Sequence, residues 1–95
     1  MNLSLLIEGD VQQAFASYLR EQRKTAKLSR EALAQRSTVP ASTIKKFELT
    51  GQISFRQLLL LWQSLDDLDR LYKLTQQNKN KVVPTSIEEV LDSGF

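Results

Sequence analysis

Cysteine and histidine are both missing from this chain of 95 residues. Without cysteine there is no disulfide and no thiol chemistry, and without either residue type the usual zinc ligands are lacking. No apolar run approaches the length needed to cross a membrane. The opening apolar segment, residues 3–7, is too short for a signal peptide, and no basic residue precedes it. We therefore expect a cytoplasmic protein with no metal, no cofactor and no membrane partner.

The missing residue types also argue against an enzyme. No histidine or cysteine is present to form a nucleophile-and-base pair. The carboxylates are accounted for as helix caps and surface charges. Asp66, Asp67 and Asp69 resemble a metal cluster, but adjacent helical carboxylates fan out, and helix capping with dipole complementarity explains them better. We expect no catalytic residue and no metal site.

The charge of the chain is unevenly distributed. The net charge is only +2. Residues 20–56 contain nine lysines and arginines against three glutamates, whereas the remainder contains four basic and eight acidic residues. A basic middle between acidic ends is typical of a protein that binds a polyanion, although a solvated helix surface would have the same composition. Charge alone favours neither interpretation.

Two short helical patterns with a very brief break between them occupy residues 28–51. We expect the first helix over about 30–36 and the second over about 41–49, with Val39 as an apolar plug at the corner. Ile44 and Phe47, with Leu49 as a further candidate, supply the buried side of the second helix. Two short helices joined by a three- or four-residue turn predict a helix-turn-helix.

The ends of these two helices carry the residues that favour such ends. Ser29 is the expected N-cap of the first helix, because its hydroxyl can accept a hydrogen bond from an unpaired backbone N–H. Pro40 suits the opening of the second helix, where its missing N–H would have no partner. Gly51 suits the left-handed residue that closes it.

Residues 15–71 resemble the Cro-repressor-like (XRE-type, lambda-repressor-like) helix-turn-helix family. The pattern L-S-x-E-x-L-A-x-x-S-x-V-x-x-S-T-I-x-x-x-E is matched by Leu28, Ser29, Glu31, Leu33, Ala34, Ser37, Val39, Ser42, Thr43, Ile44 and Glu48. The family often has glycine in the turn where this chain has Thr38. Threonine is strained at a positive φ, so we expect a slightly different turn here. Residues 39–48, V-P-A-S-T-I-K-K-F-E, look most like HipB-type antitoxins.

The resemblance implies an all-α, five-helix, lambda-repressor-like DNA-binding domain that represses transcription. It implies a homodimer on an inverted-repeat operator in double-stranded DNA. The HipB resemblance implies the autoregulatory antitoxin of a toxin–antitoxin operon with a HipA-like kinase toxin. The alternatives are a stand-alone phage-type repressor and a helical protein-interaction module that does not bind DNA.

In a helix-turn-helix the second helix lies in the major groove, and its N-terminal residues reach the base edges. Ala41 can pack against a thymine methyl, Ser42 can bond a donor or an acceptor, and Lys46 can reach guanine. The predicted DNA-binding residues are Arg30, Ala41, Ser42, Thr43, Lys45, Lys46, Gln52 and Arg56. In the family, an arginine at the position of Arg23 commonly pairs with the glutamate at Glu48, and we expect this structural role before a phosphate contact.

The rest of the chain divides into an N-terminal strap or short strand (1–9), the helix-turn-helix domain (10–76, core 29–50), and a linker with a tail (77–95). Within the domain, we expect Asp10 to cap a first helix over about 11–24. Ser54 and Gln57 predict a fourth helix from Phe55, and Asp66 is expected to cap a fifth over about 67–76. In the tail, Val82-Val83 could form a short strand, and residues 87–92 are expected to form a short amphipathic helix.

The fourth helix is apolar on more than one side. Leu58, Leu61, Trp62 and Leu65 form its core stripe. Leu59 and Leu60 lie off that stripe. Either the strap or the fifth helix covers them, or they belong to a dimer interface. The possible dimer or partner surface comprises Leu59, Leu60, Ile87, Val90 and Leu91.

Overall fold

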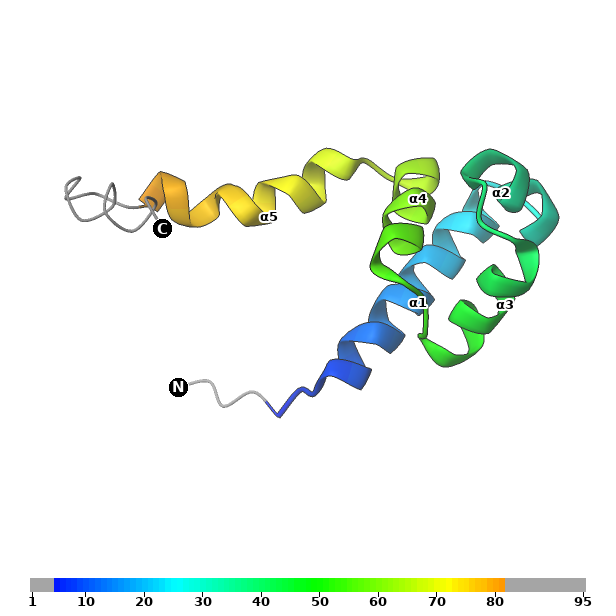
Figure 1. Cartoon of the computed structure of the whole chain (residues 1–95), viewed down its shortest axis with the longest axis horizontal. Coiled ribbons are helices and arrows are strands. Elements are labelled where there is room, and N and C mark those ends of the chain that lie inside the picture. The colour runs from blue at the N-terminus through cyan, green and yellow to red at the C-terminus, as the bar shows by residue number, and fades with distance from the viewer. Residues whose placement is uncertain (1–4, 82–95) are drawn as a thin grey trace.

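The computed structural model describes the backbone of residues 5–81 and the side chains of residues 5–76. Every element in this range is a helix, and for these residues the prediction of an all-α domain with five helices is confirmed (Figure 1). The helices are α1 (Glu8–Thr25), α2 (Arg30–Ser37), α3 (Ala41–Thr50), α4 (Phe55–Leu65) and α5 (Leu68–Lys81). α3 packs on α1 and α2, and α4 packs on the same two helices. α5 leaves α4 and extends away from the other helices (Figure 1).

One hydrophobic core holds α1 to α4 together. Its buried residues are Ala16, Leu19, Leu33, Val39, Ile44, Phe47, Leu61 and Trp62. Phe15 and Tyr18 pack on Trp62 with ring centroids 5.7 and 5.3 Å away, so aromatic contacts join α1 to α4. Leu49, a candidate for this core, is 61% exposed. Leu49 therefore lies on the outer side of α3, away from the core.

The start of α1 differs from the prediction. Asp10 does not cap the helix from outside; it is the third helical residue, and its carboxylate accepts a hydrogen bond of 3.1 Å from the Ile7 N–H. The helix therefore begins three residues earlier than expected, at Glu8. A carboxylate in the first turn stabilises the helix by reaching back to an unpaired N–H, so Asp10 still has a terminal role.

α1 ends in a Schellman motif that the sequence analysis missed. The Lys27 N–H donates to the carbonyl of Lys24 (2.9 Å), and the Leu28 N–H donates to that of Arg23 (3.1 Å). Lys27 is the left-handed residue of this motif, with φ 59°. Glycine usually occupies this position because it has no Cβ to clash there, and its absence hid the motif.

The expected N-terminal strap does not cover the core at residues 5–7. The exposed fractions are 88% for Leu5, 67% for Leu6 and 62% for Ile7. Leu60 is half-buried and packs against the core, as do Leu68 and Leu71 of α5, and Leu59 is also half-buried. The second side of α4 is therefore covered in part by its own domain.

The start of α5 is held by several side chains. Asp67, not Asp66, caps it: its carboxylate accepts the Asp69 N–H at 3.0 Å. Asp66 instead accepts hydrogen bonds from the Tyr18 hydroxyl and from Arg70 (2.8 Å), which ties α5 to α1. The Tyr18 hydrogen bond is the largest cause that lowers the pKa of Asp66, and Arg70 adds to it.

The end of α5 also differs from the prediction. The helix continues to Lys81, five residues beyond the expected end at Gln76, because no glycine or proline interrupts residues 68–81. The predicted strand at residues 82–83 and the predicted tail helix at 87–92, with Ile87, Val90 and Leu91, lie outside the described residues.

Candidate nucleic-acid interface

The α2–turn–α3 unit has the local geometry that its sequence predicts. The Ser29 hydroxyl accepts the Ala32 N–H at 3.0 Å and caps α2. Val39 is 1% exposed and plugs the corner, with its N–H bonded to the Ser37 hydroxyl at 3.1 Å. Gly51 closes α3 at φ 81°. These contacts fix the angle between the two helices.

The turn differs from the expectation at Thr38. This threonine adopts the left-handed conformation itself, with φ 66° and ψ 11°, so the turn is not altered to avoid it. The Thr38 N–H donates to the carbonyl of Ala34 at 2.8 Å, and its hydroxyl donates to the carbonyl of Ser37. Strain in a β-branched residue at positive φ is tolerated here because these bonds and the burial of Val39 over-determine the turn.

α3 separates its buried and exposed faces cleanly. Ile44 and Phe47 are at most 1% exposed and anchor the helix to the core. Ser42, Lys45 and Lys46 are exposed, whereas Ala41 and Thr43 are half-buried. The exposed face of α3 therefore presents one hydroxyl and two ammonium groups, and the buried face anchors the helix to the core.

Glu48 lies at the centre of a three-residue ion cluster. Its carboxylate accepts hydrogen bonds from Nε and Nη2 of Arg23, at 2.7 and 3.0 Å, and the predicted Arg23–Glu48 pair is present. Arg23 also donates to the carbonyl of Leu28 at 2.9 Å. The Glu48 side chain is 3% exposed and that of Arg23 is 11% exposed. The cluster joins α1 to α3 in the interior.

Arg30 is the third member of the cluster, which the sequence analysis did not foresee. Its Nε lies 2.9 Å from Oε1 of Glu48, and its side chain is 28% exposed. Burial raises the pKa of Glu48, but hydrogen bonds and positive charge from Arg23 and Arg30 outweigh burial and lower its pKa overall. One carboxylate and two guanidinium groups leave a positive charge next to the start of α2.

A hollow lies beside α3 on its exposed side. It is lined by Ser42, Thr43, Lys46, Gln52, Ile53 and Gln57. Four of the eight predicted DNA-binding residues therefore come together there; the other four, Arg30, Ala41, Lys45 and Arg56, do not line the hollow. Gln57 was missed as a site residue because the sequence assigned it to the cap of α4. It does both: its N–H bonds the Ser54 hydroxyl at 3.1 Å, and its side chain lines the hollow.

Hydrogen bonds position the segment between α3 and α4. The Thr50 hydroxyl donates to the carbonyl of Lys46 at 2.7 Å and accepts the Gln52 N–H at 3.1 Å. Gly51 lies against α1, where a Cβ would approach the backbone of Gln12 to 3.2 Å. Gln52 is therefore held beside the C-terminal end of α3.

Within the described residues, no group of three or more His, Cys, Asp or Glu side chains is placed to hold a metal ion. No helix within them is long and apolar enough to cross a membrane. No protein-family model, curated protein or solved structure matches the chain.

Proposed function

We propose that this chain binds double-stranded DNA by placing α3 in the major groove and that it represses transcription. The observation that carries the proposal is the exposed row of Ser42, Lys45 and Lys46 on a helix anchored by buried Ile44 and Phe47. A rigid, outward-facing helix with hydroxyl and ammonium groups at its N-terminal end is what direct readout needs.

The residues of α3 divide into base and phosphate contacts. Ser42 and Lys46 line the hollow, and they are the proposed base contacts. Half-buried Ala41 is proposed to pack against a thymine methyl, and Thr43 to contact the same groove. Lys45 does not line the hollow, and it is proposed to contact phosphate.

The flanking elements supply the remaining phosphate contacts. Gln52 and Gln57 line the hollow beside the start of α4, where the positive end of the helix dipole favours an anion. Arg30 is oriented by Glu48, so its guanidinium would meet a phosphate without first being ordered. Arg56, which is exposed on α4, is proposed to make a more peripheral contact.

The resemblance of residues 39–48 to HipB-type antitoxins supports a narrower biological role. In that role the chain is a cytoplasmic homodimer that binds the inverted repeat upstream of its own operon. Its protein partner is a HipA-like kinase toxin. A stand-alone phage-type repressor would bind DNA equally well. A kinase-like reading frame next to this gene would favour the antitoxin role over the stand-alone repressor.

Fluorescence anisotropy with the DNA upstream of the gene, beside a scrambled duplex, tests the proposal. The Ser42→Ala/Lys46→Ala variant should lose preference for the upstream DNA while its circular dichroism stays unchanged. Ser17→Ala/Lys73→Ala removes the same two residue types from α1 and α5 and is the matched control. Equal, weak binding of both duplexes by the wild-type protein would overturn the proposal and favour a protein-interaction module.

A further inference from the structure

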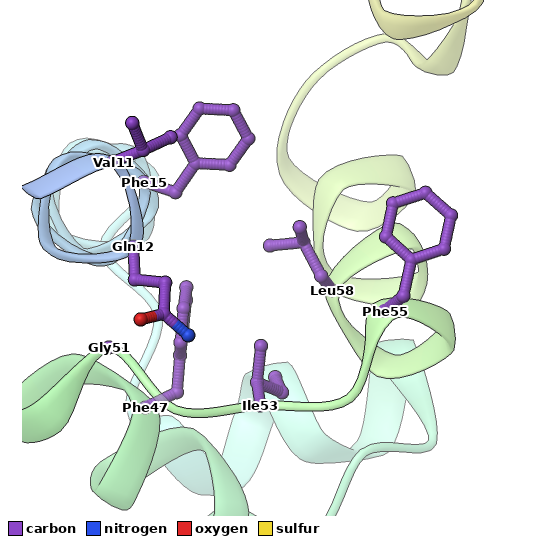
Figure 2. Close-up of a pocket in the computed structure, with 8 residues that line it drawn as sticks. All are labelled: Val11, Gln12, Phe15, Phe47, Gly51, Ile53, Phe55 and Leu58. Atoms are coloured by element: carbon purple, nitrogen blue, oxygen red, sulfur yellow. The ribbon is translucent and has the colours of Figure 1, made fainter. Parts of the chain in front are cut away.

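A second surface feature, separate from the exposed face of α3, is an open pocket between α1 and α4. Its volume is about 230 Å³. Figure 2 shows side chains from the first half of α1, the end of α3 and the start of α4 around it. The lining residues are Val11, Gln12, Phe15, Phe47, Gly51, Ile53, Phe55 and Leu58. None of them carries a charge.

The rim of the pocket exposes large apolar side chains. Phe55, the first residue of α4, is 73% exposed, and Val11 across the pocket is 46% exposed. The apolar surface continues beyond the rim, because Ile7 precedes Val11 by one helical turn and is 62% exposed. A contiguous exposed apolar patch on a protein usually marks an interaction site.

The patch carries both a protruding aromatic ring and a pocket. A dry cavity of about 150 Å³ accepts benzene, so a pocket of about 230 Å³ has room for a phenyl ring. The protruding ring of Phe55 stands on the rim of that same pocket. A twofold interface requires the knob and the hole to lie on one patch, because each copy presents the same surface to the other.

The absence of charge in the pocket lining also fits a second copy of the chain as the occupant. A twofold axis brings each side chain near the axis close to its own copy, so any charge there would meet a like charge. The lining contains no charged residue, and this repulsion does not arise. A small domain also buries a limited part of its apolar surface alone, which favours a second copy as the cover.

The geometry points to a homodimer in which the Phe55 ring of each copy occupies the pocket of the other. Phe55 lies one helical turn before Leu59, so this interface would centre on the N-terminal end of α4 instead of on the middle leucines. The inference concerns self-association, and it holds whether or not α3 binds DNA.

Sedimentation velocity of the full chain over a concentration series, without DNA, tests the inference. The wild-type protein should dimerise, and Phe55→Ala should raise the dissociation constant at least about tenfold, as expected for a central aromatic anchor. Leu74→Ala is the matched control: Leu74 is 60% exposed on α5, and its removal should leave the constant unchanged. Val11→Glu is a second variant; it should also produce monomers, because two added carboxylates would face an apolar pocket.

Isotope-filtered nuclear Overhauser measurements on a mixture of labelled and unlabelled chains give a direct reading. Contacts between the Phe55 ring of one copy and the Val11 methyls of the other are expected. A wild-type protein that stays monomeric at millimolar concentration would overturn the inference and leave the pocket to a different molecule. A dimer that survives both Phe55→Ala and Val11→Glu would place the interface elsewhere.

Discussion

The carboxylate of Glu48 lies 2.7 Å from Nε of Arg23, although the two residues are 25 positions apart in the chain. The contact joins the last helical turns of α1 and α3, and it is nearly sealed from solvent. Arg30 reaches the same carboxylate from the start of α2. One acidic side chain therefore fixes the relative positions of three helices that bear on the proposed DNA-binding face.

Glu48→Gln should destabilise the fold by roughly 2–4 kcal/mol, because it leaves two guanidinium groups beside a neutral amide in a buried site. Urea unfolding followed by circular dichroism measures the change. Arg30→Gln is the comparison variant. Because the Arg30 side chain is more exposed than those of Arg23 and Glu48, Arg30→Gln should lower the free energy of unfolding by less than Glu48→Gln does. Equal losses for the two variants would contradict a cluster centred on Arg23 and Glu48.

The same cluster predicts a pH dependence. Its arginines lower the pKa of Glu48 in the folded state below the ordinary value of 4.5. A carboxylate with a lowered folded pKa contributes stability that is complete above its unfolded pKa and is lost as the pH falls through the folded one. The difference in unfolding free energy between wild type and Glu48→Gln should therefore be constant near neutral pH and shrink below about pH 4.5. A difference that grows on acidification would contradict this assignment.

Gly51→Ala should destabilise the protein by about 1–3 kcal/mol. Alanine is strained at φ 81°, and its Cβ would approach the Gln12 backbone to 3.2 Å. Gly9→Ala is the matched control, because Gly9 is helical and nothing lies within 4 Å of the added Cβ. That change should stabilise α1 by about 0.5–1 kcal/mol. Melting temperatures of the two variants should move in opposite directions.

Lys27→Gly and Thr38→Gly should each stabilise the fold by roughly 1 kcal/mol. Both residues have positive φ, at 59° and 66°, where a side chain is strained and glycine is not. Lys24→Gly is the control inside α1, and it should destabilise by about 1 kcal/mol. Chemical denaturation distinguishes these signs. A loss of stability in Thr38→Gly would mean that its hydroxyl bond to Ser37 outweighs the strain.

DNA affinity, if the proposed function holds, should depend steeply on salt. Three cationic phosphate contacts in each copy of a dimer, from Arg30, Lys45 and Arg56, predict a loss of about 10³-fold between roughly 50 and 200 mM salt. Lys45→Ala, as a phosphate contact, should weaken binding to all sequences alike and reduce the salt slope. Anisotropy titrations at several salt concentrations measure both quantities. A flat salt response would contradict DNA binding through this face.

The features that sequence reasoning predicted correctly depend on neighbours along the chain. Ser29 and Ser54 cap their helices by accepting an N–H three residues ahead, and Gly51 supplies a left-handed conformation at its own position. Such contacts need only a residue type at a fixed spacing. The Arg23–Glu48 pair is the exception, because a family resemblance and not spacing predicted it. The DNA-binding roles of the α3 residues stay predictions.

The sequence by itself predicted the five helices of residues 8–81, the spacing of α2 and α3 and the apolar residues that anchor α3, because helical periodicity and the Ser29 and Ser54 caps are local. Only the tertiary structure decided that Arg30 shares Glu48, that Gln57 joins the hollow, and that Asp66 bonds Tyr18. It also decided that Phe55 stands exposed beside an apolar pocket. The reason is physical: these relationships join residues on different helices, and their distances are set by how the helices pack around one core.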